Sequence, residues 1–324
     1  MSRGGPARRV AVVGGAGFIG SHVVERLAGQ GWAVLVIDDG SHPCGIPLPA
    51  GVDLLEAGGG SEAARHALLR FRPSALVHLA AKGGVNRALR DPAAHVVSVL
   101  AESVGCFAAA QAAGCREIVI ASSGGAVYGD ARVLPAGERL RPAPRSAYGA
   151  EKLCEETYLA TFAQHGVRTL ALRYGNVYGP RQDGTGEAGV VAITATRLLQ
   201  GRSAVIFGDG MQTRDFVYVA DVADATVAAL QTGRSGAVNV GTGRETTVSD
   251  IVNGLVELTR RGADIDHQPA REGEVRRAAL DASRAERWLG WRAQTQLTDG
   301  LARTAAFFAG RPPALTATAA QGAR

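Results

Sequence analysis

The N-terminal part of the chain places an apolar run, a glycine loop and a helix-like stretch in direct succession. Residues 10–13 are Val-Ala-Val-Val, and Gly14-Gly15-Ala16-Gly17-Phe18-Ile19-Gly20 follows at once. Such glycines allow a tight turn and a close approach of the backbone to a diphosphate, while the helix N-terminus presents free N–H groups and partial positive charge. In a chain with 43 glycines a glycine-rich match arises easily by chance, so the evidence lies in the order of strand, loop and helix. The order predicts a dinucleotide-binding βαβ unit.

A second apolar run supports this interpretation and indicates which dinucleotide binds. Residues 33–37 are apolar and end at Asp38, about twenty residues beyond the loop. A carboxylate at that place accepts hydrogen bonds from both ribose hydroxyls of NAD and repels the additional phosphate of NADP. The predicted cofactor is therefore NAD.

Bulk composition excludes several other classes of protein. The chain has 324 residues, of which 46% are hydrophobic, and a net charge of +5 that is spread along the sequence. No basic stripe with aromatic residues indicates nucleic-acid binding, and no run reaches the roughly 18 apolar residues of a membrane span. The four cysteines lack metal-ligand or redox spacing, so no metal site is expected and a reducing, cytoplasmic compartment is predicted.

The pattern of elements predicts an α/β fold, a Rossmann-type doubly wound parallel sheet with a smaller C-terminal substrate lobe. Residues 8–175 form the expected NAD-binding domain, residues 176–309 a substrate-binding lobe with the option that the chain crosses back to the first domain, and residues 310–324 a disordered tail. Strands are expected at 10–13, 33–38, 52–55, 75–79, 117–122 and 168–173, and helices at 18–29, 61–70, 92–113, 146–165, 189–200, 221–231, 248–261 and 298–309. The long, alanine-rich helices at 92–113 and 146–165 are the expected interface of a homodimer.

Tyr148 and Lys152 form the candidate catalytic pair. They lie four residues apart at the start of a predicted helix, so the phenol and the ammonium project from the same face. A nearby ammonium favours the phenolate, which brings the pKa of the tyrosine toward the working range of a general base. Lys152 can also donate to the nicotinamide ribose. The pair predicts proton transfer beside a hydride-accepting cofactor.

With these motifs the chain resembles the extended short-chain dehydrogenase/reductase family, in particular its NAD-dependent nucleotide-sugar epimerases and dehydratases. The resemblance covers about residues 8–309 and rests on several motifs in the same order. They are the loop at 14–20, His78-Leu79-Ala80-Ala81, the segment 122–129 (SSGGAVYG), Tyr148-x-x-x-Lys152, the segment 173–180 (RYGNVYGP), the segment 212–217 (QTRDFV) and Arg271-Glu272-Gly273-Glu274.

The resemblance implies a UDP-sugar substrate and a set of binding residues. Arg214 and Arg271 are expected to hold the diphosphate, Asn176 to contact the phosphate region and Glu274 to bind the nucleotide ribose. Paired guanidinium groups on a diphosphate form charge-assisted hydrogen bonds, which suits that role. The complete implied sets are Gly14, Gly17, Phe18, Ile19, Gly20, Asp38, Leu79, Ala80, Ala81, Lys152 and Tyr174 for the cofactor, and Lys82, Gly124, Asn176, Val190, Arg214, Arg271, Glu274 and Ala278 for the substrate.

The segment that ends at Tyr128 discriminates between the reactions of this family. Its 4,6-dehydratases carry an Asp-Glu pair, and its decarboxylases a Glu, at the positions that are Gly125 and Ala126 here. Without a second acid or base, the resemblance implies a 4-epimerase. In this cycle Tyr148 takes the proton of the sugar 4-hydroxyl while hydride passes to NAD, the 4-keto sugar turns over, and hydride returns to its other face.

The sequence also departs from the family pattern. The usual catalytic Ser/Thr position is Gly124, so we expect the hydroxyl to come from Ser123, with Ser122 as the alternative. Glu56-Ala57-Gly58 stands where an adenine-binding Asp is common, and Ser98 or Val99 replaces an Asn of the following helix. Cofactor binding is therefore expected to rely on the glycine loop, Asp38 and Lys152.

The identity of the sugar is left open at this point. Ala278 falls at a position that is a bulky gate in strict glucose/galactose epimerases, so UDP-N-acetylhexosamines are expected to fit beside UDP-hexoses. UDP-glucuronate is an alternative, with Arg181 as the partner of its carboxylate. Two further functions stay open, namely a dehydratase or decarboxylase with relocated acid/base residues, and a non-catalytic nucleotide-binding protein.

Overall fold

The centre of the protein is a seven-stranded sheet in which all neighbouring strands run parallel. In this computed structural model residues 8–81, 91–186, 189–260, 264–271 and 274–310 are described. The strand order is β11-β6-β5-β4-β1-β2-β3, so the order reverses between β1 and β4, where ligands of such sheets bind. The strands are β1 (Arg9–Val13), β2 (Ala33–Asp38), β3 (Asp53–Glu56), β4 (Ala75–His78), β5 (Glu117–Ser123), β6 (Arg168–Tyr174) and β11 (Gly236–Val240).

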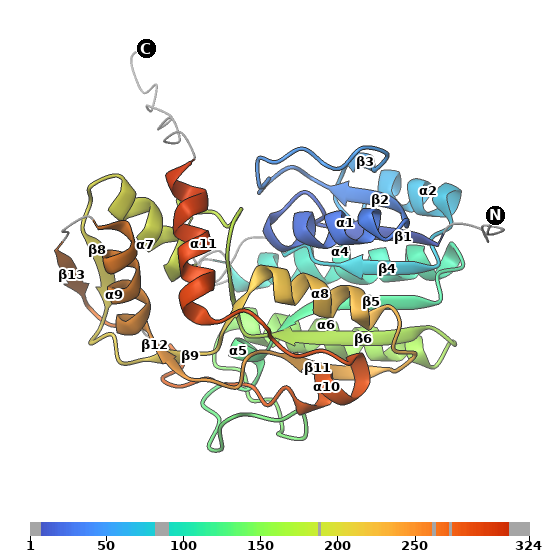
Figure 1. Cartoon of the computed structure of the whole chain (residues 1–324). Coiled ribbons are helices and arrows are strands. Elements are labelled where there is room, and N and C mark those ends of the chain that lie inside the picture. The colour runs from blue at the N-terminus through green and yellow to red at the C-terminus, as the bar shows by residue number, and fades with distance from the viewer. Residues whose placement is uncertain (1–7, 82–90, 187–188, 261–263, 272–273, 311–324) are drawn as a thin grey trace, which may run out of the picture.

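Helices cover both faces of this sheet, which explains why its central strands are almost continuously apolar. Val10 and Val12 of β1 join one core, and Ala11 and Val13 join the other. The first core includes α1 (Phe18–Gly29), α8 (Val219–Ala229) and α10 (Ser283–Leu289); the second includes α2 (Glu62–Phe71), α4 (Pro92–Ala112) and α6 (Ala147–Ala163). Figure 1 shows this three-layer arrangement.

A smaller lobe stands beside the carboxyl ends of the strands (Figure 1). Its core is formed by α7 (Val190–Leu199), α9 (Val248–Thr259) and α11 (Leu297–Ala309), which pack on one another and on the parallel pair β8 (Ala204–Phe207) and β13 (Ile265–Gln268). Two short pairs connect the lobe to the sheet, β7 (Asn176–Tyr178) with β10 (Phe216–Tyr218), and β9 (Thr213–Arg214) with β12 (Thr246–Thr247).

The predicted doubly wound parallel sheet with a smaller lobe is confirmed, and the chain does cross back from the lobe to the sheet. After β10 it forms α8 against α1 and then β11, which pairs with β6 as the seventh strand. This strand was not among the predicted ones. Its sequence, Gly236-Ala-Val-Asn-Val240, is short and contains a glycine and an asparagine, which weakens the apolar signal.

Local caps explain where two important helices begin. The Ser146 hydroxyl accepts a hydrogen bond from the N–H of Gly149, so α6 starts directly before Tyr148. The Asp91 carboxylate accepts from the N–H of Ala94 at the start of α4. In the described part of the chain no helix is long and apolar enough to cross a membrane. The predicted tail lies outside the described residues beyond Gly310.

Candidate active site

The glycine loop forms a close-packed cradle at the point where the strand order reverses. Gly14 has a φ of 77°, and a Cβ there would lie 2.7 Å from the backbone nitrogen of Ala80. A Cβ on Gly20 would lie 2.0 Å from the carbonyl oxygen of Gly14. Both positions therefore require glycine, and the loop leads directly into α1 as a diphosphate site needs.

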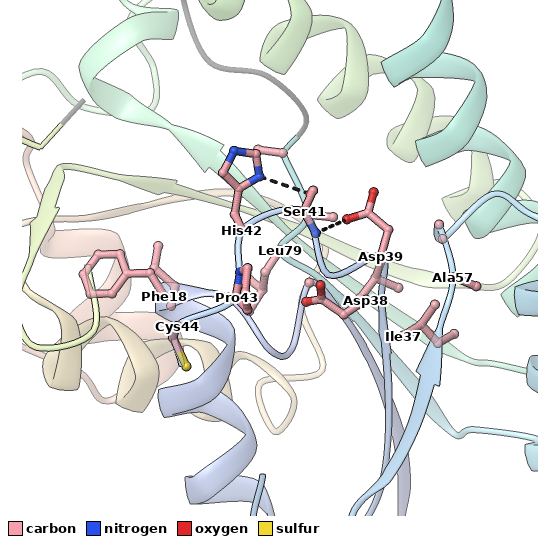
Figure 2. Close-up of a pocket in the computed structure, with 18 of the residues that line it drawn as sticks. Phe18, Ile37, Asp38, Asp39, Ser41, His42, Pro43, Cys44, Ala57 and Leu79 are labelled. Atoms are coloured by element: carbon pink, nitrogen blue, oxygen red, sulfur yellow. Dashed lines mark hydrogen bonds between the residues drawn. The ribbon is translucent and has the colours of Figure 1, made fainter. Parts of the chain in front are cut away.

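A pocket of about 440 Å³ extends from this loop across the ends of β2 and β4. Most of the predicted cofactor residues line it, and Figure 2 shows several of them around its edge. The predicted residues that line it are Gly14, Gly17, Phe18, Ile19, Asp38, Leu79, Ala80 and Ala81.

Asp38 is held in a fixed orientation at this pocket. One carboxylate oxygen accepts the N–H of Ala16 at 2.9 Å and the other accepts the N–H of Gly40 at 3.0 Å. Each oxygen retains a lone pair for a ribose hydroxyl. Together with the glycine cradle, this carboxylate fits the adenosine diphosphate half of NAD, and its charge opposes a 2′-phosphate.

The pocket contains residues that the sequence analysis missed. The loop after β2 contributes Asp39 and His42, and α4 contributes Glu102. Figure 2 shows the His42 ring bonded to Ser41 of the same loop. The Glu102 carboxylate accepts the N–H of Gly59 at 2.9 Å, so it also fixes the chain directly after Glu56-Ala57-Gly58. Residues 39–44 form no recognisable motif, so their position directly after a strand is the only signal in the sequence that they line the pocket.

Tyr148, Lys152 and Ser123 come together where β5 ends beside α6. The Ser123 side chain lies close enough to the Tyr148 phenol to favour its ionised form, and the Lys152 Nζ atom lies 5.7 Å from the centre of the Tyr148 ring. Lys152 is only 2% exposed, so its charge acts on the phenol with little screening by water. This arrangement can move a proton at the phenol oxygen and hold a substrate hydroxyl beside it.

Burial dominates the acidity of Tyr148. It raises the pKa of the phenol above its ordinary value, Lys152 acts in the opposite direction, and Glu151 and Glu155 raise the pKa further. Lys152 thus lowers the pKa of Tyr148 as predicted, but burial raises this pKa by more. The pKa of Lys152 itself is raised, because Glu155, Tyr148 and Glu151 outweigh the effect of its burial.

Ser122 is directed to a different set of partners. Its hydroxyl donates to Glu156, which also forms a 2.6 Å ion pair with Arg173. Arg173 in turn donates to the Tyr128 hydroxyl at 2.9 Å, and Tyr128 donates to Asn239 at 2.8 Å. This buried network joins β5, β6, α6 and β11, and it assigns Ser122 to the support of the site.

Gly124 is explained by its packing against Leu280. A Cβ at Gly124 would lie 2.5 Å from a methyl carbon of Leu280 and 3.2 Å from the carbonyl oxygen of Arg173. A serine at this position therefore requires the buried Leu280 side chain to shift. The neighbouring Gly125 faces Asn176, since a Cβ there would lie 3.2 Å from the Asn176 side-chain oxygen.

Asp215 connects the segments that carry the substrate candidates. Its carboxylate accepts the N–H groups of Thr242, Gly243 and Leu280 at 2.7, 2.9 and 3.0 Å, and it is 1% exposed. Its carbonyl oxygen accepts the N–H of Asn176 at 2.6 Å. One buried residue therefore fixes Asn176 relative to the segment that contains Ala278 and Leu280.

Two of the charged substrate candidates form an ion pair, and the third contacts an aromatic ring. Arg214 donates to the Glu274 carboxylate at 2.7 Å, and the Arg214 side chain is 12% exposed. Arg271 lies with its guanidinium 4.0 Å from the centre of the Phe207 ring. Phe207, at the end of β8, was missed by the sequence analysis, because a single aromatic residue before Gly208 gives no motif.

The other predicted residues occupy varied places. Val190 opens α7, Ala278 is buried, and the Tyr174 hydroxyl is bonded to Thr226 of α8 at 2.8 Å, so this side chain points into the core. Arg181 pairs with Glu25 of α1 at 2.5 Å and lines the cofactor pocket, which does not fit the expectation that it binds a uronate. Lys82 lies outside the described residues. Within the described ranges, no three His, Cys, Asp or Glu side chains form a group that could hold a metal ion.

Comparison with known proteins agrees with this geometry. The sequence profile of the NAD dependent epimerase/dehydratase family matches residues 10–241. A UDP-glucose 4-epimerase of Mycolicibacterium smegmatis is 38% identical over 312 residues, which cover 93% of this chain and 98% of that protein.

Two solved structures are similar along nearly their whole length. The UDP-glucose 4-epimerase of Thermotoga maritima with UDP-glucose has a TM-score of 0.88 at 38% identity and covers 93% of this chain and 98% of its own. The enzyme of Thermus thermophilus in complex with NAD has a TM-score of 0.88 at 37% identity, with 93% and 99% covered. The glycine cradle, the Tyr148–Lys152 pair and these matches lead to one conclusion: the chain belongs to the NAD-dependent epimerase/dehydratase family.

Proposed function

We propose that this protein is an NAD-dependent UDP-hexose 4-epimerase. The observation that carries the proposal is the Tyr148 phenol, close to Ser123 and facing Lys152, beside a segment in which Gly125 and Ala126 provide no carboxylate. Such a site can exchange the proton of one hydroxyl but lacks the additional acid and base that elimination requires. The names of the relatives that match along nearly the whole chain agree with this reaction.

The residues of this chain then have distinct tasks. Bound NAD supplies the reversible uptake of hydride. Tyr148 removes the proton of the sugar 4-hydroxyl and later returns it, Ser123 holds that hydroxyl by a hydrogen bond, and Lys152 stabilises the phenolate. Because the same tyrosine serves both directions, the net reaction changes only the configuration at C4.

The nucleotide half of the substrate is assigned to the smaller lobe. We infer that Arg271 and Arg214 bind the diphosphate, since guanidinium groups form paired, charge-assisted hydrogen bonds with phosphate oxygens. On this assignment the Arg214–Glu274 ion pair opens or shifts when Glu274 binds the ribose. Asn176, fixed by Asp215, stands between the diphosphate and the sugar.

The sugar is UDP-glucose or UDP-galactose in this proposal, and UDP-N-acetylhexosamines are accepted as well because Ala278 is small. UDP-glucuronate is the less favoured alternative, since Arg181 is paired with Glu25. A dehydratase or decarboxylase would need acid and base residues other than those at 125 and 126. A non-catalytic binding role would leave the Tyr148–Ser123–Lys152 arrangement without a purpose.

The proposal includes a homodimer in the cytoplasm. α4 and α6 pack side by side, and Val97 and Tyr158 on their outer surfaces are 67% and 49% exposed. Apolar side chains exposed to this extent on two neighbouring helices suit a subunit contact. The four free cysteines suit a reducing compartment.

The test is to incubate the purified protein separately with UDP-glucose, UDP-N-acetylglucosamine and UDP-glucuronate and to identify the products. We expect UDP-galactose and UDP-N-acetylgalactosamine. The Tyr148→Phe variant should retain its fold and lose on the order of 10²–10⁴-fold in kcat. A wild-type protein that yields a dehydrated or decarboxylated product, or a Tyr148→Phe variant with full activity, contradicts the proposal.

A further inference from the structure

A carboxylate that belongs to none of the recognised motifs lies directly behind Lys152. The Glu155 side chain, one helical turn further along α6, has one oxygen 2.7 Å from the Lys152 Nζ atom. Its other oxygen accepts the hydroxyl of Ser103 on α4 at 2.7 Å. Glu155 is 1% exposed and Ser103 2% exposed, so the carboxylate is bound at both oxygens in a site that water hardly reaches.

This arrangement differs from an ordinary ion pair on a helix surface. A surface pair contributes little and leaves both side chains free to move. A buried carboxylate is costly unless it is paired and its second oxygen is also bonded. Ser103 meets that requirement from a different helix, so Glu155 is fixed between α4 and α6 and fixes the long Lys152 side chain in turn.

The charges around Lys152 show what the carboxylate does to the phenol. Lys152 faces two carboxylates, Glu155 at 2.7 Å and Glu151 at 3.5 Å. Burial alone would raise the pKa of Glu155, but the charge of Lys152, with smaller effects of His78 and Ser103, outweighs it, and the pKa lies below its ordinary value. Glu155 is therefore ionised at neutral pH, and it offsets part of the positive charge that Lys152 directs at Tyr148.

The end of β4 brings a further titratable group to the cluster. His78 is buried, and its Nε2 atom has no hydrogen-bond partner among the described residues. Burial lowers the pKa of His78, with Glu155, Lys152 and Glu102 as the charges that act on it. His78 is thus neutral. Besides burial, the proton affinity of Tyr148 is set by Glu151, Lys152 and Glu155 on α6 and by Ser123 on β5.

We propose that Glu155, held by Ser103, is a positioning residue that fixes the Lys152 ammonium in front of Tyr148 and limits how strongly this ammonium acidifies the phenol. The inference rests on the proposed function, in which Tyr148 is the acid/base. The charge of Glu155 and the length of its side chain have separate effects. Removing the charge changes the proton affinity of Tyr148, whereas shortening the side chain loosens Lys152 and lowers kcat.

The experiment follows the carbon NMR signal of isotope-labelled tyrosine rings across pH, with the Tyr148 signal assigned by the Tyr148→Phe variant. In Glu155→Gln the titration midpoint of Tyr148 is expected to fall by about one pH unit, because one negative charge a few ångströms away is removed. The acid limb of the kcat profile should move by a similar amount. In Glu155→Asp the midpoint should stay near that of the wild type, while kcat falls by about fivefold with KM unchanged.

Glu151→Gln and Glu151→Asp are the matched controls on the same helix. Glu151 also raises the pKa of Tyr148, so the midpoint of Glu151→Gln should fall by at least as much. Its 3.5 Å contact with Lys152 is the longer one, so Glu151→Asp should lower kcat by less than Glu155→Asp. An unchanged midpoint in Glu155→Gln, or a loss of kcat in Glu151→Asp as large as that in Glu155→Asp, overturns the inference. If Glu155→Gln does not fold, Ser103→Ala replaces it: a loss of about threefold in kcat at constant KM supports the role, and wild-type kinetics refute it. The NMR midpoint needs no substrate, so wild-type protein that converts no UDP-sugar refutes the proposed function without deciding the inference on Glu155.

Discussion

Leu280 occupies the space that any side chain at position 124 would need. A Cβ on Gly124 would lie 2.5 Å from one Leu280 methyl carbon and 2.7 Å from the other. Leu280 has little freedom to move away, because it is 1% exposed and its N–H is bonded to the buried Asp215. A side chain at position 124 therefore requires Leu280 to move.

This contact predicts the outcome of restoring the family residue. Gly124→Ser should destabilise the protein by about 1–3 kcal/mol, the usual cost of overpacking, and should lower kcat as the end of β5 is displaced. The double variant Gly124→Ser, Leu280→Ala should recover much of this loss. Chemical unfolding and steady-state kinetics of the single and double variants test this, and additive effects would contradict the contact.

The two neighbouring serines should respond differently to substitution. Ser123→Ala removes the hydroxyl beside Tyr148 and should lower kcat by about 10- to 100-fold with little change in stability. Ser122→Ala removes a bond to Glu156 and should cost about 1 kcal/mol in stability with a small kinetic effect. Measurement of kcat and of the unfolding free energy for both variants decides the matter, and the opposite pattern would assign the role to Ser122.

The sequence was sufficient to predict six of the seven strands of the sheet, and it located the glycine loop and Asp38 that line the pocket at its edge. Strands such as Val10–Val13 are short, apolar and bounded by glycine, and the helices between them are long, so periodicity alone separates them. β11 was missed because its apolar residues alternate with small and polar ones. Its place at the edge of the sheet depends on pairing with β6, which is set by tertiary structure and has no local signal.

The lack of a local signal for contacts between distant segments also explains which site residues were found. Gly14, Asp38, Tyr148 and Lys152 belong to motifs with fixed spacing, so sequence locates them. Glu102, Phe207 and Glu155 act through contacts between segments that lie far apart in the chain, and no spacing rule connects Glu155 with Ser103. Arg181 belongs to no motif, and it was the expected partner of a uronate carboxylate, whereas it pairs with Glu25 on α1.

A bulky side chain at position 278 should narrow the range of sugars. Ala278→Tyr is expected to reduce kcat/KM for UDP-N-acetylglucosamine by at least about tenfold while changing the value for UDP-glucose by less than about threefold, because only the larger substituent meets the new ring. Kinetics with both substrates provide the comparison. Equal losses for the two sugars would mean that position 278 is not a gate.

The low pKa of His22 in the folded protein should lower the free energy of unfolding in acid. Burial lowers the pKa of His22 from 6.5 to about 4, and its ring bonds the carbonyl oxygen of Pro180 at 3.1 Å. Between these two values the unfolded chain takes up a proton that the folded protein does not, so the free energy of unfolding falls as the pH falls. The His22 contribution to this loss amounts to at most about 3 kcal/mol.

The corresponding measurement is chemical unfolding at about pH 7 and about pH 4.5 for His22→Gln and for the wild type. The variant should lose less stability on acidification, and His165→Gln, which replaces an exposed histidine, should behave as the wild type. An identical loss in all three proteins would show that His22 does not contribute.

The proposed dimer predicts an effect of charge on α6. Tyr158→Arg should convert a dimer to a monomer, since a buried, unpaired arginine at a subunit contact is unfavourable. Val133→Arg changes a residue that is 69% exposed outside α4 and α6 and should leave the dimer intact. Light scattering after gel filtration gives the masses. A monomeric wild type would remove this part of the proposal.

The most direct measurement for the account as a whole is the reaction with UDP-glucose in deuterated water, followed by NMR and mass spectrometry of the product. If Tyr148 exchanges only the hydroxyl proton and the hydride returns to the carbon it left, the product is UDP-galactose without deuterium on carbon. Solvent deuterium on a sugar carbon, or a product that has lost water, would contradict the simple 4-epimerase reaction.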